Sequence, residues 1–192
     1  DVNGEARATL KVLEKNGVKE KRDGFIVDLV ADEAIAWLQQ RNGSHSFAVS
    51  IHFREPHAAY LPVPDEDWAK VKDLDPIVPN PDFPGLDVAR AKKLTRDYLA
   101  SVTALDRNIG RILDTLDRLR LAENTFLIYT SDHGYNIGHH GIWHKGNAAW
   151  LLNKESLPPG TPNIPLGERP NIFDTSRHVP LAIGSASGRE RV

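Results

Sequence analysis

The residues best suited to chemistry follow a short apolar segment in the second half of the chain. In TFLIYTSDHG, Asp132 and His133 follow residues 125–130 after one serine, and residues 125–130 are typical of a central strand. A carboxylate oxygen beside an imidazole nitrogen forms a half-site for a divalent cation. Neighbouring side chains in a strand point to opposite faces, so this pair can share a ligand only after the chain leaves strand geometry, a turn that Gly134 permits. The alternative is an ordinary turn, because Asp and Gly are common turn residues.

A second group of candidates lies in the glycine-rich segment GYNIGHHGIWHKGN. It contains His139, His140 and His144, with Lys145 beside them. One interpretation is an anion site, in which Lys145 is a point charge and the imidazoles donate hydrogen bonds to sulfate or phosphate oxygens. The other is a solvated surface loop. A zinc site from His140 and His144 is disfavoured, because the glycines argue against a helix and no H-E-x-x-H motif is present.

His57 follows another segment with strand character. Residues 47–53, FAVSIHF, are rich in β-branched and aromatic residues, and the sequence R-E-P-H comes directly after them. In open α/β sheets, ligands bind just outside the carboxyl ends of the strands. A lone histidine is more often structural, but this position makes His57 a candidate site residue.

The elements that must position these side chains alternate between helix and strand. Apolar residues at helical spacing predict an amphipathic helix over residues 25–38 and a long helix over residues 94–119. VPLAI, residues 179–183, indicates one more short strand. We expect residues 1–24 to form a surface loop or short ribbon, and the proline-rich residues 61–84 to form an ordered surface loop. A helix, a strand and polar residues at the strand's end predict an α/β fold.

Composition limits the functions that need to be considered. The chain has 192 residues, 24 Lys plus Arg, 26 Asp plus Glu and no Cys or Met. This length fits one globular domain or a piece of one, and the lack of Met suggests a piece of something longer. Balanced, interspersed charge disfavours nucleic-acid and membrane-surface binding, and no apolar run approaches the roughly 18 residues of a membrane span. Without Cys, these residues can form no disulfide, thiolate metal site or cysteine nucleophile.

Four blocks of the sequence, in order, resemble the sulfatases of the alkaline-phosphatase superfamily. They are FAVSIHFREPHAAYLPVP, the stretch from YLASV to SDHG, GHHGIWHKG, and RPNIFDTSRHVPLAI. The similarity extends over roughly residues 25–184, and four ordered blocks are far more specific than one motif. The resemblance implies part of an alkaline-phosphatase-like sulfatase domain, with a central mixed or parallel sheet flanked by helices. Residues 1–192 would then belong to a single catalytic domain.

The resemblance also implies roles for individual residues. Asp132 and His133 would be two ligands of an active-site calcium ion. Lys145 and His57 would contact the sulfate group, and either could assist departure of the alcohol. His140 matches the histidine of the family's G-E-H-G loop and is a weaker substrate-binding candidate.

Other features that the resemblance implies do not occur in this sequence. The family's formylglycine nucleophile is made from Cys or Ser in a C/S-x-P-x-R motif, and the nearest serine, Ser156, lies in S-L-P-P-G, with Gly where Arg is required. An Asp-Asp pair and a G-K-x-H segment are also absent, and we expect all three motifs upstream. We therefore expect a sulfatase segment that carries the later half of the calcium and sulfate site and is inactive by itself.

The resemblance implies a sulfated small molecule or glycan as substrate, and a periplasmic, extracellular or lysosomal location. It does not indicate an oligomeric state. Two alternatives stay open: a phosphodiesterase or phosphonate hydrolase of the same superfamily, and a non-catalytic, anion-binding relative. Because sheet neighbours would be missing from a segment, we also expect exposed apolar surface and a tendency to aggregate.

Overall fold

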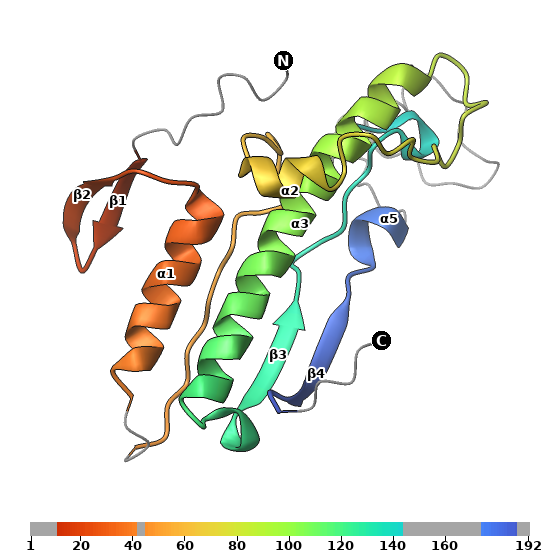
Figure 1. The fold of residues 1–192 in the computed structure, drawn as a ribbon. Helices are drawn as coiled ribbons and strands as arrows, with labels where there is room; N and C mark the ends of the chain where they lie inside the picture. The colour runs from red at the N-terminus through yellow and green to blue at the C-terminus, as the bar shows by residue number, and fades with distance from the viewer. Residues whose placement is uncertain (1–10, 42–44, 144–173, 188–192) are drawn as a thin grey trace, which may run out of the picture. The chain divides into compact units, whose positions relative to one another are not determined.

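A computed structural model describes most of the chain in two compact units. The described residues are 11–41, 45–143 and 174–187. Unit 1 comprises residues 1–74, 96–127 and 184–192, and unit 2 comprises residues 75–95 and 128–183. Figure 1 shows the helices and strands along the chain.

The N-terminal described segment is an antiparallel hairpin. Strands β1 (Lys11–Lys15) and β2 (Val18–Arg22) pair with Lys15 opposite Val18. The two residues between them, Asn16 and Gly17, have φ angles of 52° and 82°. Positive φ at both central residues is the geometry of a tight hairpin turn that matches the twist of the strands. Of the two expectations for this region, the short ribbon is confirmed.

Both predicted helices are present. Helix α1 spans Ile26–Gln39, and α3 spans Val88–Arg118, so α3 begins before the predicted start at residue 94. Within unit 1, the buried stripe of α1 packs against that of α3 in a core whose buried members are Ala31, Ala34, Leu38, Ile112, Leu116, Ala122 and Ala186. The helical spacing of the apolar residues therefore predicted correctly which faces of α1 and α3 are buried.

The proline-rich stretch contains a short helix that the sequence did not predict. Helix α2 spans Asp65–Ala69 and follows Pro64, whose fixed φ suits a helix start. Val63 and Val71 flank α2 and join Ala100 and Ala104 of α3 in a second buried cluster of unit 1. The expectation of an ordered surface loop was therefore incomplete, because this segment also contributes to the core.

The strand predicted over residues 47–53 is not a strand in the structure. Phe47, Ile51 and Phe53 pack against the cores of unit 1, whereas His52 between them is exposed. Residues 51–53 thus keep the two-residue alternation of a strand, but Val49, which the same alternation would place inside, is 45% exposed. None of the described strands pairs with this segment, and a strand is defined by its hydrogen-bonded neighbour.

A second two-stranded sheet consists of β3 (Phe126–Thr130) and β4 (Leu181–Ser185). A short 3₁₀ turn, η1 (Ala122–Asn124), leads from α3 into β3. The strands are antiparallel, because Thr130 Oγ1 donates to the carbonyl of Pro180 at 3.1 Å, and Ala186 N donates to that of Thr125 at 3.0 Å. β3 confirms a strand within residues 125–130, but among the described residues it pairs with β4 alone and is therefore not the central strand that was predicted. β4 begins later than the predicted residue 179.

Large apolar side chains of this sheet are exposed. The exposed ones are Phe126, Ile128, Tyr129, Leu181 and Ile183. The expectation of exposed apolar surface is therefore confirmed for the described residues. Separately, none of the described helices has the length and hydrophobicity that crossing a membrane requires.

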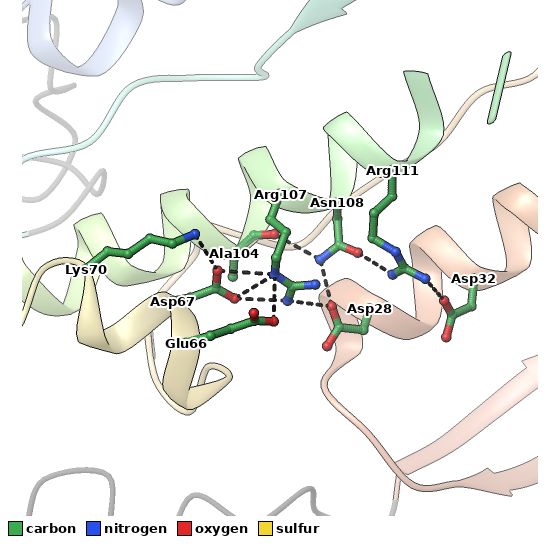
Figure 2. Close-up of polar contacts among 9 residues, drawn as sticks. All are labelled: Asp28, Asp32, Glu66, Asp67, Lys70, Ala104, Arg107, Asn108 and Arg111. Carbon is green, nitrogen blue, oxygen red and sulfur yellow. Dashed lines mark hydrogen bonds and ion pairs between the residues drawn. The ribbon is translucent and has the colours of Figure 1, made fainter. Parts of the chain in front are cut away.

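A charged cluster joins three helical segments within unit 1 (Figure 2). Arg107 of α3 donates to Asp67 of α2 at 2.9 Å and to Asp28 of α1 at 2.8 Å. Asn108, the next residue of α3, donates to the same oxygen of Asp28 at 2.7 Å. The Asp67 side chain is fully buried. Burial alone would lower the pKa of Arg107, but the hydrogen bonds to Asp67 and Asp28 outweigh it and raise the pKa.

We expect Arg107→Gln to destabilise the chain by about 3 kcal/mol, because it leaves the buried Asp67 carboxylate without its main counter-charge. Urea unfolding followed by circular dichroism measures this change. The matched control is Arg96→Gln, on the same helix α3. Arg96 donates to the backbone carbonyl of Leu74 at 3.2 Å in an exposed hydrogen bond, so its loss should cost at most about 1 kcal/mol. Equal losses in the two variants would contradict a special role for the buried cluster.

We expect the exposed sheet to drive aggregation of the isolated 192 residues. Ile128→Lys places a charge on β3, at a side chain that is 65% exposed, and should increase the soluble fraction. Ile77→Lys is the matched control, since Ile77 is 91% exposed but lies outside any helix or strand. Static light scattering of the purified variants compares them. An equal benefit from both substitutions would show that added charge, and not the sheet, controls solubility.

Candidate active site

Asp132 and His133 lie just beyond the end of β3, in unit 2. The chain has left strand geometry there, and the two side chains turn toward each other. Nε2 of His133 is 3.3 Å from Oδ2 of Asp132, and the backbone N–H of His133 donates to Oδ1 of Asp132 at 3.0 Å. The Asp132 side chain is 81% exposed and that of His133 is 32% exposed. A carboxylate oxygen and an imidazole nitrogen therefore face the same accessible space.

One hydrogen bond fixes the tautomer of His133. Its Nδ1 lies 2.8 Å from the carbonyl oxygen of Gly134. A carbonyl can only accept, so Nδ1 carries the proton, and Nε2 of the neutral ring presents a lone pair. A histidine that binds a metal through one nitrogen commonly donates from the other to such a carbonyl. At 3.3 Å, Oδ2 of Asp132 and Nε2 of His133 can share either a proton or a divalent cation, so the geometry is compatible with both.

The described residues provide only part of a metal site. Nowhere in the described ranges do three or more His, Cys, Asp or Glu side chains come together as a ligand set. Calcium takes six to eight oxygen ligands, whereas Asp132 and His133 supply one carboxylate and one nitrogen. The geometry therefore matches a half-site.

Gly134 is required here for space and not for an unusual backbone angle. Its φ is not among the positive values in the chain, so the turn itself would tolerate a side chain. A Cβ at this position would lie 2.1 Å from the carbonyl oxygen of Thr175, which belongs to the short helix α5 (Asp174–Arg177). The backbone N–H of Gly134 donates to the carbonyl of Ser176 at 2.7 Å. The expected reason for the glycine was therefore wrong, because close approach of α5 is the constraint.

His57 lies in unit 1, in the loop that follows residues 47–53. Its backbone N–H donates to the carbonyl of Arg54 at 2.9 Å, and its Nδ1 contacts the carbonyl of Ala58. As in His133, a carbonyl partner places the proton on Nδ1 and leaves Nε2 for other partners. His57 is exposed and lines a cavity of about 190 Å³ together with Arg54, Glu55 and Tyr60.

The other predicted site residues are not described. Lys145 and His144 lie outside the described residues, as does the side chain of His140. The backbone of residues 139–141 forms a single 3₁₀ turn, η2 (His139–Gly141). Nearby, the guanidinium of Arg90 lies over the ring of Trp143 at 4.5 Å. The structure thus brings together Asp132 and His133, and it describes His57 separately in the other unit.

Sequence reasoning missed two sets of polar residues near these positions. The first is Glu55, whose Oε2 is buried without a hydrogen-bond partner in the described structure. Burial raises the pKa of this carboxyl. The second set comprises Asn136, Thr175 and Ser176, which are linked by hydrogen bonds beside Gly134. The matched block RPNIFDTSRHVPLAI contains Thr175 and Ser176, so the block was found but the contact to Asn136 was not.

Comparison with known proteins identifies the family. The family model described as Sulfatase matches residues 6–158, which is more than half of the chain. The chain therefore belongs to the sulfatase family.

Individual relatives support this assignment. The chain is 28% identical over 168 residues to a sulfatase of Formosa agariphila, covering 71% of this chain and 32% of that protein. It is 41% identical over 91 residues to iduronate 2-sulfatase of Homo sapiens, covering 47% of this chain and 16% of that protein. A solved structure of a protein in complex with its substrate D-glucosamine-2-N,6-O-disulfate aligns with a TM-score of 0.67 and 19% identity, over 89% of this chain and 45% of that one. That likeness shows a shared fold, and this chain spans about a third or less of the two sequence relatives.

Burial raises the pKa of Glu55, so its ionised form should lower the free energy of unfolding by an amount that depends on pH. Because the folded-state pKa lies above the unfolded value, the penalty is absent below the unfolded pKa, grows as the pH rises from the unfolded to the folded pKa, and is complete above the folded one. Glu55→Gln should therefore stabilise the chain at pH 7 and have little effect at pH 3.5. Urea unfolding at both pH values measures this difference.

Glu123→Gln, at an exposed position, controls for removing one negative charge. The interpretation fails if Glu55→Gln stabilises the chain equally at both pH values, or if Glu123→Gln reproduces its effect.

Proposed function

We propose that the protein carrying this chain is a sulfuric ester hydrolase, in which Asp132 and His133 provide part of a divalent-cation site. The observation that carries the proposal is the geometry after β3. Two metal-ligating atoms, Oδ2 of Asp132 and Nε2 of His133, lie 3.3 Å apart, with the imidazole tautomer set by Gly134. Membership in the sulfatase family supports assigning this half-site to sulfate ester chemistry.

A divalent cation held there would polarise the sulfate oxygens and stabilise the charge that develops on them. The resemblance to sulfatases implies that this ion is calcium and that the nucleophile is a formylglycine, and we propose both for the full-length protein. Residues of this chain would hold the sulfate against the cation. The Lys145 ammonium would act as a fixed positive charge beside the equatorial oxygens. His140 is a weaker candidate for a further hydrogen bond.

His57 would handle the proton of the leaving group. Its Nδ1 is occupied by the carbonyl of Ala58, so Nε2 is the atom that exchanges protons with a ligand. A protonated His57 would donate from Nε2 to the departing oxygen as the S–O bond breaks, and would leave the alcohol neutral. Lys145 could supply the same proton, and the two assignments differ in the pH dependence of turnover.

A sulfated sugar is the substrate class that the comparisons favour. One relative is named for iduronate, and the solved neighbour holds a disulfated glucosamine. We propose a sulfated glycan fragment as substrate. Export to a periplasmic, extracellular or lysosomal space follows from the family resemblance and stays a prediction.

The test compares Asp132→Asn with Asp75→Asn in the full-length gene product. Asp132→Asn keeps the shape of the proposed ligand and removes its charge, so kcat/KM on 4-nitrophenyl sulfate should fall by about 100-fold or more, the upper part of the range for disturbed metal sites. Asp75 is exposed and pairs with Lys92 at 2.6 Å in the same unit, so its substitution should change the rate by less than about twofold.

Bis(4-nitrophenyl) phosphate is assayed in parallel. Faster turnover of the phosphodiester than of the sulfate would contradict the proposal and favour a phosphodiesterase. Binding of sulfated glycans without any turnover would instead favour the non-catalytic relative.

A further inference from the structure

The loop that carries Asp132 and His133 is tied to α5 by a chain of buried polar groups in unit 2. Thr175 Oγ1 donates to Oδ1 of Asn136 at 2.6 Å, and Nδ2 of Asn136 donates to Oγ of Ser176 at 2.7 Å. Asn136 has 0% of its surface exposed, and Ser176 is also buried. A buried amide costs free energy unless it is hydrogen-bonded, so this arrangement is specified by the pairing of the three side chains.

The same contact continues through the backbone to the imidazole of His133. The carbonyl of Ser176 accepts from the N–H of Gly134 at 2.7 Å. The carbonyl of Gly134 in turn accepts from Nδ1 of His133 at 2.8 Å. Gly134 is thus held at both of its polar groups, once by α5 and once by the ring. A shift of α5 would move the carbonyl that sets the tautomer and orientation of His133.

Local structure alone does not explain this arrangement. Helix α5 has only four residues, Asp174–Arg177, which is too short to be stable without tertiary contacts. The Asp132 and His133 side chains are largely or partly exposed, so packing holds them weakly. The absence of space for a Cβ at Gly134 shows that the two segments are in direct contact. The buried polar groups are therefore the main constraint on the loop.

We propose that Thr175 and Ser176 are positioning residues for the cation half-site, acting on His133 through Asn136 and Gly134. This inference rests on the proposed function, because it requires Asp132 and His133 to bind a cation. Neither residue touches the cation or the substrate. They restrict the loop to the conformation in which Nε2 of His133 and Oδ2 of Asp132 face each other.

The test measures calcium affinity in the full-length gene product by isothermal titration calorimetry, with the melting temperature in EDTA as a second readout. Thr175→Val removes the hydroxyl that donates to Asn136 and keeps the branched shape. Ser176→Ala removes the other partner of Asn136. Each should weaken calcium binding by about tenfold or more, the effect expected for outer groups that orient a ligand. Thr175→Ser keeps the hydroxyl and should restore affinity to within about threefold of the unsubstituted protein.

The controls separate positioning from general stability. If Thr175→Val or Ser176→Ala lowers the melting temperature in EDTA but leaves the calcium Kd of the folded protein unchanged, the inference is overturned. It is also overturned if Thr175→Ser binds calcium as weakly as Thr175→Val. Should Thr175→Val fail to fold, Ser176→Ala tests the same contact from its other end.

Two outcomes distinguish this inference from the proposed function. An unsubstituted protein that binds no divalent cation would overturn the proposed metal half-site and the inference together. Cation binding with sulfate ester turnover, unchanged in the Thr175 and Ser176 variants, would overturn the inference alone.

Discussion

The packing of the helices in unit 1 depends on one guanidinium. Arg107 connects α3 to Asp28 of α1 and to the fully buried Asp67 of α2 (Figure 2). The apolar contacts around it include many small side chains, such as Ala31, Ala100 and Ala104, which let helices approach closely but bury little area each. Larger side chains, including Leu38, Ile112 and Leu116, pack in the same core and stabilise the helices. The fork of Arg107 adds a directional constraint on their register, since it can satisfy two carboxylates only in one arrangement.

The same principle operates on a smaller scale at the end of β3. There the polar groups of Asn136, Thr175 and Ser176 satisfy one another, and a glycine allows the two backbones to meet. In both places a buried polar contact fixes geometry that apolar packing leaves loose. The difference is what each contact positions: the packed helical segments of unit 1 in one case, and the two proposed cation ligands of unit 2 in the other.

Long helices could be predicted from the sequence, because they depend on the spacing of neighbouring side chains. Strand pairing and the burial of polar side chains could not, because they depend on contacts with distant segments. The stripes of α1 and α3 follow from side-chain spacing alone, so both helices were predicted. Residues 47–53 have the composition and alternation of a strand, yet pairing is a property of two segments, and no described strand lies beside them. The burial of Glu55 and Asn136 was equally invisible, because a polar residue gives no sign in the sequence of which tertiary contacts will cover it.

In the candidate site, one feature could be predicted from the sequence and another could not. Asp132 and His133 are adjacent in sequence, so a turn after β3 is enough to bring Oδ2 and Nε2 to 3.3 Å, and their pairing could be anticipated. The orientation of the ring could not, because it depends on a carbonyl that is held by Ser176, more than 40 positions away in the chain. The residues of a half-site can therefore be adjacent in the sequence, while their orientation depends on segments far away in the chain. A cation that needs six or more ligands draws them from several segments of the chain. Residue types identify the candidate ligands, but the folding of those segments around one point determines whether the candidates bind the same ion.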